Sequence, residues 1–236
     1  MLPTIEIPRF ETVLPSTKKK IEFRPYLVKE EKILMIASES KDEKQILKAI
    51  KDMIRACTFD KINPDDLTVF DLEYLFLKLR AKSVGESSKI KLKCEACASF
   101  TDTSINLDEI EPTIDPGFAN NRIMLTDDIG VTIKLVSVRA ISRIDLSDKG
   151  NSVNRVMELL AASIETVFDK KGVYAADTLQ KGELGTFIDS LNRQQLGKIE
   201  EYIKLLPKLE KTIEFKCSKC EKENSIILSG LQSFFT

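Results

Sequence analysis

Four cysteines are the residues of this sequence best suited to chemistry. Cys94 and Cys97 form one Cys-x-x-Cys pair, and Cys217 and Cys220 form a second. A Cys-x-x-Cys turn between two strands directs both thiolates toward one point and supplies half of a tetrahedral metal site. Two turns of the same form therefore predict a single four-thiolate centre.

The segments around the two pairs form an internal repeat. Residues 90–107 read IKLKCEACASFTDTSINL, and residues 213–228 read IEFKCSKCEKENSIIL. Each contains an alternating strand, the sequence Lys-Cys-x-x-Cys, a polar stretch and a second strand, as in a hairpin of a zinc ribbon. Because residues 98–216 separate the pairs, the rest of the fold must bring the two hairpins together before a metal binds.

We expect one structural Zn²⁺ per chain, because zinc suits four thiolates in a closed site. An iron–sulfur cluster uses the same ligands and stays open as an alternative. A redox role for one pair is also open, although the matched contexts of the two pairs disfavour it. The fifth cysteine, Cys57, shares a helical stripe with Ile50, Met53 and Ile54. It is expected to be a small core residue, since free cysteine packs like a hydrophobic side chain.

Two features of the sequence argue against an enzyme. It contains no histidine, which excludes every mechanism that uses an imidazole as base or metal ligand. It also lacks a glycine-rich phosphate loop, a G-x-S-x-G elbow and an H-E-x-x-H motif. We therefore predict no catalytic residues, no small-molecule substrate and no organic cofactor.

Composition limits the classes of partner. The 236 residues are 42% hydrophobic, which is ample for a sizeable core, and they carry 36 basic against 37 acidic residues. A net charge of -1 provides no overall field for a polyanion, so the basic run at 18–20 is expected to be a solvated turn. No apolar run is long enough to span a membrane, and residues 1–10 lack a signal-peptide core. These features, with cysteines expected to be reduced, predict an intracellular protein.

The patterns predict an α+β fold in which helical bodies surround paired β-hairpins that form a split, zinc-ribbon-like Cys₄ site. Expected helices cover 28–38, 40–57, 64–82, 153–168, 181–191 and 193–206, the second opened by a capping box at Ser40 and Glu43. Outside the Cys segments, expected strands cover 122–126 and 131–138.

The expected domain organisation has three parts. Residues 1–25 form a proline-punctuated extended arm, with a small hairpin near residues 15–17. Residues 26–229 form a single domain that contains the split knuckles at 89–107 and 211–229, and residues 230–236 form a tail.

The tail contains Phe234 and Phe235, which are candidate partner-binding residues. A terminal aromatic pair either inserts into a partner or packs into the core of its own protein, and both interpretations apply to this sequence.

Three stretches resemble the T4-like bacteriophage baseplate hub protein family, which includes a hub subunit and a hub-assembly factor. They are LPTIEIP at 2–8, FRPYLVKEEK at 23–32, and DLEYLFL with RAKSVGE within 71–86. The resemblance continues through the first Cys pair, and the second pair and the Phe-Phe tail fit it. It implies a role in forming or building the central hub of a contractile tail, with other hub and tail proteins as partners. It places the protein in the host cytoplasm during assembly and leaves its presence in the virion baseplate open.

The leading hypothesis is therefore a baseplate hub structural or assembly protein that acts by protein–protein binding. The alternative is a zinc-ribbon nucleic-acid-binding protein, such as a phage transcription accessory factor. An enzyme that uses cysteine or lysine is a third class. Binding to DNA or RNA that weakens as salt rises would distinguish the alternative from the leading hypothesis.

Overall fold

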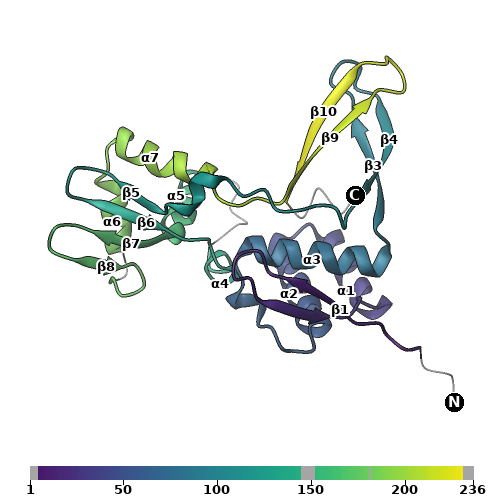
Figure 1. Ribbon diagram of the computed structural model, residues 1–236, viewed down its shortest axis with the longest axis horizontal. Coiled ribbons are helices and arrows are strands. Elements are labelled where there is room, and N and C mark those ends of the chain that lie inside the picture. Colours follow the sequence, from purple (N-terminus) through teal and green to yellow (C-terminus); the bar gives the residue numbers. More distant parts are fainter. Residues whose placement is uncertain (1–4, 145–151, 181, 231–236) are drawn as a thin grey trace. The chain divides into compact units, whose positions relative to one another are not determined.

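The structure is a computed structural model that describes residues 5–144, 152–180 and 182–230 (Figure 1). The chain divides into two compact units, and both cysteine pairs belong to unit 1. Unit 1 comprises Met1–Pro64, Phe70–Thr113 and Lys208–Thr236, and unit 2 comprises Asp65–Val69 and Ile114–Pro207. The mixture of helices and antiparallel hairpins confirms the predicted α+β class.

The helices of unit 1 are α1 (Val28–Ser40), α2 (Glu43–Cys57) and α3 (Val69–Val84). A short 3-10 turn at Pro64–Asp66 precedes α3 in the chain. The stripe predicted on α2 is buried, and Cys57 at its end is completely inaccessible. Helix α3 is buried on several faces, because nearly every residue of its central turns is apolar. It therefore forms the centre of unit 1, as its sequence predicts.

The predicted capping box at Ser40 is wrong. Helix α1 continues through Ser40, whose hydroxyl donates to the Ala37 carbonyl at 2.7 Å. Asp42 instead caps α2, and its carboxylate accepts from the Lys44 amide at 2.9 Å, which lowers the pKa of Asp42. The serine hydroxyl is already used within α1, so the neighbouring carboxylate takes the cap position.

The predicted N-terminal hairpin consists of β1 (Phe10–Val13) and β2 (Lys20–Phe23) in antiparallel register. Leu14, Ile21 and Phe23 are buried, so the hairpin contributes to the core of unit 1. Its turn is fixed to α3, because the amide of Ser16 donates to Asp71 Oδ1 at 3.1 Å and the Ser16 hydroxyl donates to the same carboxylate.

The two cysteine-bearing hairpins are β3 (Ser87–Lys93) with β4 (Phe100–Asn106), and β9 (Glu210–Lys216) with β10 (Glu223–Ser229). Apolar side chains from both hairpins and from α3 share one buried cluster, and Figure 1 shows the hairpins side by side. The buried members of this cluster are Phe70, Tyr74, Leu77, Ala81, Ile90, Leu92, Ile105, Leu107, Ile110, Leu209 and Phe215. The hydrophobic face of α3 therefore holds both hairpins in one body.

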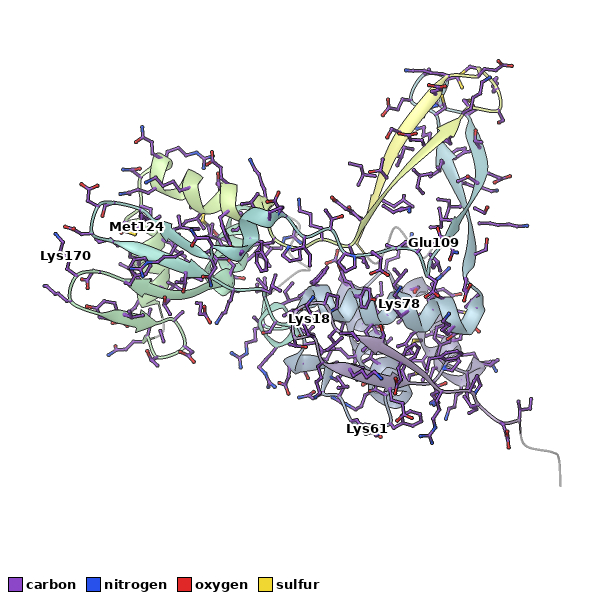
Figure 2. All side chains as sticks on the ribbon, in the orientation of Figure 1. Lys18, Lys61, Lys78, Glu109, Met124 and Lys170 are labelled. Carbon is purple, nitrogen blue, oxygen red and sulfur yellow. The ribbon has the colours of Figure 1, made fainter. Side chains whose placement is uncertain are left out.

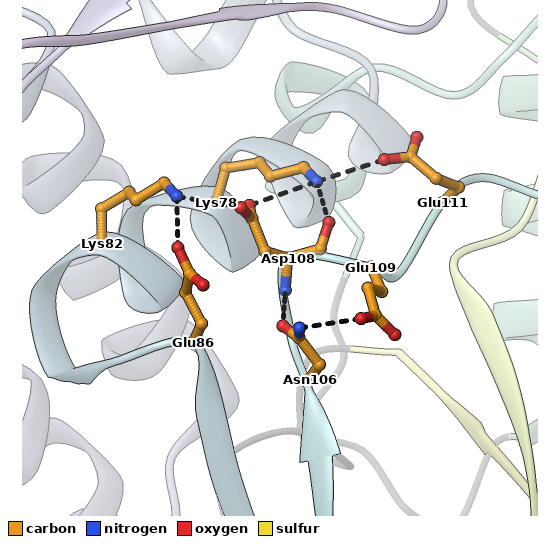
Figure 3. A network of polar contacts seen from close by, with 7 residues as sticks. All are labelled: Lys78, Lys82, Glu86, Asn106, Asp108, Glu109 and Glu111. Atoms are coloured by element: carbon orange, nitrogen blue, oxygen red, sulfur yellow. Dashed lines mark hydrogen bonds and ion pairs between the residues drawn. The ribbon is translucent and has the colours of Figure 1, made fainter.

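A polar network fixes the loop after β4 to α3 (Figure 3). Lys78, which is only 8% exposed, donates to the Asp108 carbonyl at 2.7 Å and to the Glu111 carboxylate at 3.3 Å. Lys82 donates to Asp108 at 2.9 Å and to Glu86 at 2.7 Å, and the bond to Asp108 lowers the pKa of that carboxyl. The lysines thereby anchor both ends of the first hairpin.

A short antiparallel bridge returns the chain to unit 1. The Thr113 amide donates to the Lys208 carbonyl at 2.9 Å, and the Lys208 amide donates to the Thr113 carbonyl at 3.1 Å. This bridge brings the chain leaving β4 next to the chain entering β9, so the long connection between the hairpins closes here.

Unit 2 contains a four-stranded antiparallel sheet in the order β5-β6-β7-β8. Its strands are β5 (Arg122–Met124), β6 (Gly130–Ile133), β7 (Ile164–Phe168) and β8 (Val173–Ala175). Its helices are α4 (Val138–Ile141), α5 (Ser152–Ser163), α6 (Glu183–Asp189) and α7 (Arg193–Lys204), with a 3-10 turn at Pro116–Ala119. Buried side chains from the sheet, α5, α6 and α7 form the core of this unit.

Two predictions within unit 2 are wrong at their boundaries. The helix predicted over 153–168 ends at Ser163, and the next five residues form β7, which pairs with β6. Ile164, Thr166 and Val167 are β-branched and fit a strand that has a neighbour to pair with. The strand predicted to reach Val138 ends at Ile133, and Val138 begins α4.

Gly130 begins β6 where the sheet allows no side chain. A Cβ atom at this position would lie 2.2 Å from the Phe168 ring, so only glycine permits the close approach of β7.

Among the described residues, no helix combines the length and the apolar character that crossing a bilayer requires.

We predict that residues 26–229 behave as one cooperative unit despite the division of the chain. Separating the chain near residue 145 would leave β3 and β4 in one fragment and β9 and β10 in the other. Neither fragment should then show a cooperative thermal transition, because the N-terminal fragment loses the second hairpin from the buried cluster and the C-terminal fragment loses α3. Circular dichroism of the separately expressed fragments measures this, and two independently folding fragments would contradict it.

Candidate metal centre

The first Cys pair lies in a six-residue hairpin turn. The Cys94 amide donates to the Ser99 carbonyl at 2.8 Å, and the Ala98 amide donates to the Cys94 carbonyl at 3.0 Å. Ala98 has a φ of 56°, in the left-handed region that closes the turn. This backbone directs the Cys94 and Cys97 side chains to the same side of the loop.

The turn around the second Cys pair has the same two backbone hydrogen bonds as the first. The Cys217 amide donates to the Lys222 carbonyl at 2.9 Å, and the Glu221 amide donates to the Cys217 carbonyl at 3.0 Å. Glu221 has a φ of 57°, close to the 56° of Ala98 in the first turn. The sequence repeat is therefore also a repeat of backbone conformation.

The N-terminal hairpin adopts the same turn without any cysteine. The Leu14 amide donates to the Lys19 carbonyl, and the Lys18 amide donates to the Leu14 carbonyl, both at 2.9 Å. Lys18, labelled in Figure 2, has a φ of 57° and is exposed like its two lysine neighbours. Because this turn forms without thiolates, its conformation alone does not mark a metal site, and the positions of the sulfur atoms must do so.

The four sulfur atoms converge on one point. All lie within 4.8 Å of one another, with Cys94 Sγ 3.7 Å from Cys220 Sγ and Cys97 Sγ 3.6 Å from Cys217 Sγ. These distances exceed the ~2.0 Å of a disulfide bond. Four thiolates bonded at ~2.3 Å to a tetrahedral ion would lie about 3.8 Å apart. The predicted ligand set is therefore brought together in a geometry that can hold one metal ion.

Two further contacts join the hairpins reciprocally. The Glu95 amide, next to Cys94, donates to Asn224 Oδ1 at 3.2 Å. The Ser218 amide, next to Cys217, donates to Thr101 Oγ1 at 3.2 Å. Each amide follows the first cysteine of its pair, and each acceptor occupies the same position on the other hairpin. The interface thus has an approximate two-fold relation within a single chain, like the interface of a symmetric dimer.

The Ser99 hydroxyl lies between two of the sulfur atoms, at 2.9 Å from Cys97 Sγ and 3.2 Å from Cys217 Sγ. Its hydrogen bond lowers the pKa of Cys97. The same hydroxyl, helped by the amides of Cys220 and Lys219, lowers the pKa of Cys217 to about 5. Ser99 therefore favours the thiolate form that a metal requires.

The pKa of Cys220 shifts in the opposite direction. The Lys222 amide lowers its pKa, but the neighbouring thiols and desolvation outweigh this bond and raise the pKa to about 12. Sulfur atoms this close cannot all ionise without a compensating positive charge. A divalent cation supplies that charge and displaces the shared protons. Cys94 and Cys217 are each 1% exposed and Cys220 is exposed, so the centre opens to solvent on one side.

The sequence identified the four cysteines that cluster but missed the residues that join the hairpins. Ser99, Thr101 and Asn224 were not predicted. Aligning the two Cys segments would have shown Thr101 and Asn224 at the same offset, as polar residues on the inner faces of their strands. Phe234 and Phe235, the candidate partner-binding residues, lie outside the described residues.

The fold and the thiol cluster define an α+β protein in which a four-cysteine centre joins two β-hairpins. The chain belongs to the T4 bacteriophage base plate protein family, whose family model matches residues 7–236. The protein is accordingly a structural protein related to the T4 baseplate, which confirms the resemblance seen in the sequence. No curated protein and no solved structure matches the chain.

We predict that replacing Cys94 or Cys217 by serine abolishes metal binding and lowers the thermal midpoint, because a three-thiolate site binds weakly and the hairpins lose the connection through the metal. Elemental analysis and thermal unfolding of the purified variants measure both effects. Cys57→Ala is the matched control and should keep its metal, since Cys57 lies in the core of unit 1 and outside the thiol cluster. Acid should release the metal by protonating the thiolates. Full stability in a metal-free wild type would contradict the assignment.

We also predict that Asn224→Ala destabilises the protein by ~1–2 kcal/mol without removing the metal. Asn224 is 7% exposed, and its loss leaves the Glu95 amide without its acceptor. Ser225→Ala is the control, because Ser225 is the exposed neighbour on the same strand and should change stability by less than ~0.5 kcal/mol. Denaturant unfolding gives both values, and equal values for the two variants would argue against a role for Asn224 in joining the hairpins.

Proposed function

We propose that this protein forms or assembles the hub of the baseplate, by binding other tail proteins and without turning over a substrate. The observation that carries the proposal is the family match over residues 7–236, which spans both hairpins and both units. The proposed place of action is the host cytoplasm during assembly. The nucleic-acid-binding alternative has no comparable support from the family match.

The arrangement of the thiol centre supports a structural role. A catalytic zinc keeps a coordination position open for water or substrate, whereas a structural zinc is closed by four protein ligands. Here the chain itself supplies four converging sulfur atoms, so a tetrahedral ion would have no position left for a substrate. The centre can therefore hold the two hairpins together, and it offers no open coordination position for a reaction.

We propose that the metal is Zn²⁺, one ion per chain. Sulfur atoms that all lie within 4.8 Å of one another leave room for a single ion between them. A cluster of several iron atoms and sulfides would need more widely spaced cysteines. Native mass spectrometry of the purified protein should show the mass of one zinc, and an iron–sulfur absorption band would contradict this assignment.

The two ends of the chain are the proposed attachment elements. Within the arm at 1–25, residues 10–23 are committed to the hairpin, and the exposed part includes Ile5, which is 90% accessible. An alternating exposed segment of this kind can add a strand to a partner's sheet. The tail at 230–236 would place Phe234 and Phe235 in an apolar pocket of another hub protein, where a buried aromatic anchor is often worth ~2 kcal/mol or more.

The test is a truncation after Ser229, the last residue of β10. We predict that the truncated protein keeps its metal and its thermal midpoint, yet no longer associates with hub components and no longer supports tail assembly in complementation. Both losses would follow from removing the aromatic anchor while leaving the metal-bearing hairpin intact.

Matched substitutions separate the anchor from the rest of the tail. Phe234→Ala with Phe235→Ala should reproduce the truncation, whereas Gln232→Ala with Ser233→Ala should behave as wild type. Normal assembly by the truncated protein would remove the tail from the proposal. An unfolded truncation would place the two phenylalanines in the protein's own core. A search for the chain in purified mature particles would establish whether it stays in the virion.

A further inference from the structure

The two cysteine-bearing hairpins use their two faces differently. Inner-face side chains of both hairpins belong to the same buried cluster with α3. Because successive strand residues alternate between faces, the remaining residues of each strand form an outer face that is turned away from this cluster. The outer faces contribute nothing to the shared core, so their composition is free to serve another purpose.

The outer face of the first hairpin is basic. Lys89, Lys91 and Lys93 alternate along β3 and are all exposed, and Lys91 lies opposite Asp102 on β4. Residues two apart on a strand are separated by about 6.8 Å, so the three ammonium groups form a row along one edge. We call Lys89, Lys91 and Lys93 the basic face.

The outer face of the second hairpin is acidic. Glu214 and Glu223 are exposed and Glu210 is partly exposed, and β9 and β10 place all three on the same side. Lys216 lies opposite Glu223 at the cysteine end of this face. We call Glu210, Glu214 and Glu223 the acidic face.

One pair of opposite charges occurs at equivalent positions of the repeat. Lys91 stands three residues before Cys94, and Glu214 stands three residues before Cys217. The two hairpins share the turn, the cysteine spacing, the reciprocal contacts and a lysine before the first cysteine, and they differ in the net charge of their outer faces. Each face also carries one large exposed apolar side chain, Phe100 at 63% on the basic hairpin and Ile227 at 61% on the acidic one.

We propose that the basic face of one copy of this chain binds the acidic face of a second copy. The two faces are of the same kind and length, because both are outer faces of seven-residue hairpin strands. Their charges attract, and Phe100 and Ile227 supply apolar surface at the contact. The contact joins different surfaces of the two copies, so it generates a ring or a linear array and leaves complementary faces at open ends.

Charge favours a second copy over a polyanion as the occupant. The whole chain has a net charge of -1, and the basic face includes Asp102 among its neighbours. Nucleic acid would account for the lysines and would leave the matched acidic face without a role. The proposal is independent of the hub assignment, because it rests only on the two hairpins of unit 1.

Sedimentation velocity of the full-length, metal-loaded protein tests the proposal with two charge-reversed variants. The first carries Lys89→Glu and Lys91→Glu, and the second carries Glu210→Lys and Glu214→Lys. Lys93 and Glu223 stay unchanged because they lie closest to the cysteines. Metal content and thermal midpoint of each variant confirm that the hairpins are intact.

The wild type should associate with rising concentration at low ionic strength and dissociate near 0.5 M salt, where the screening length is about 4 Å. Each variant has two faces of like sign, so its dissociation constant should rise roughly a hundredfold or more. An equimolar mixture of the two variants should associate again, because one now carries two acidic faces and the other two basic faces.

Three results would overturn the proposal. These are a wild type that stays monomeric at every concentration, variants that associate like the wild type, and a mixture of variants that fails to associate. A monomeric wild type that binds heparin through Lys89 and Lys91 would identify the basic face as a polyanion site instead.

Discussion

The convergence of two distant Cys-x-x-Cys turns is the constraint on which unit 1 depends. Cys94 and Cys217 belong to hairpins separated by residues 107–209, and closing so long a connection costs conformational entropy. The apolar surface of α3 offsets that cost by burying the inner faces of both hairpins, and the Thr113–Lys208 bridge closes the connection. Packing therefore assembles the ligands, and a bound metal would then hold in place an arrangement that the core has already made.

The two cysteine-bearing hairpins show which features of a structural repeat are constrained by backbone geometry and packing. The turn is a property of the backbone, since Leu14 to Lys19 adopt it without a thiolate. The inner faces are mainly apolar because they share one core, and Thr101 and Asn224 are polar residues of these faces that join the hairpins. The outer faces neither form the turn nor pack in the core, so one can be basic and the other acidic without disturbing the cysteine cluster.

Local sequence patterns predicted elements well where one structure was clearly favoured. Helix α3 was recognisable because its apolar residues cover several faces, and the cysteine hairpins were recognisable from alternation on either side of each pair. The predictions failed where contacts with other parts of the fold determined the local structure. Ile164–Phe168 has apolar residues at helical spacing, but strand β6 is available to pair with it. Ser40 can cap a helix, yet its hydroxyl bonds within α1 and Asp42 caps instead.

The sequence by itself determined the candidate ligand set, the α+β class and the family, because residue type, short spacing and periodicity are local properties that survive without a structure. Only the tertiary structure decided how the hairpins meet. Ser99 between two sulfur atoms and the reciprocal bonds of Thr101 and Asn224 link residues more than a hundred positions apart in the chain. Such contacts depend on which apolar faces α3 buries and where the chain re-enters unit 1. Those outcomes follow from packing of the whole core, and no short stretch of sequence contains them.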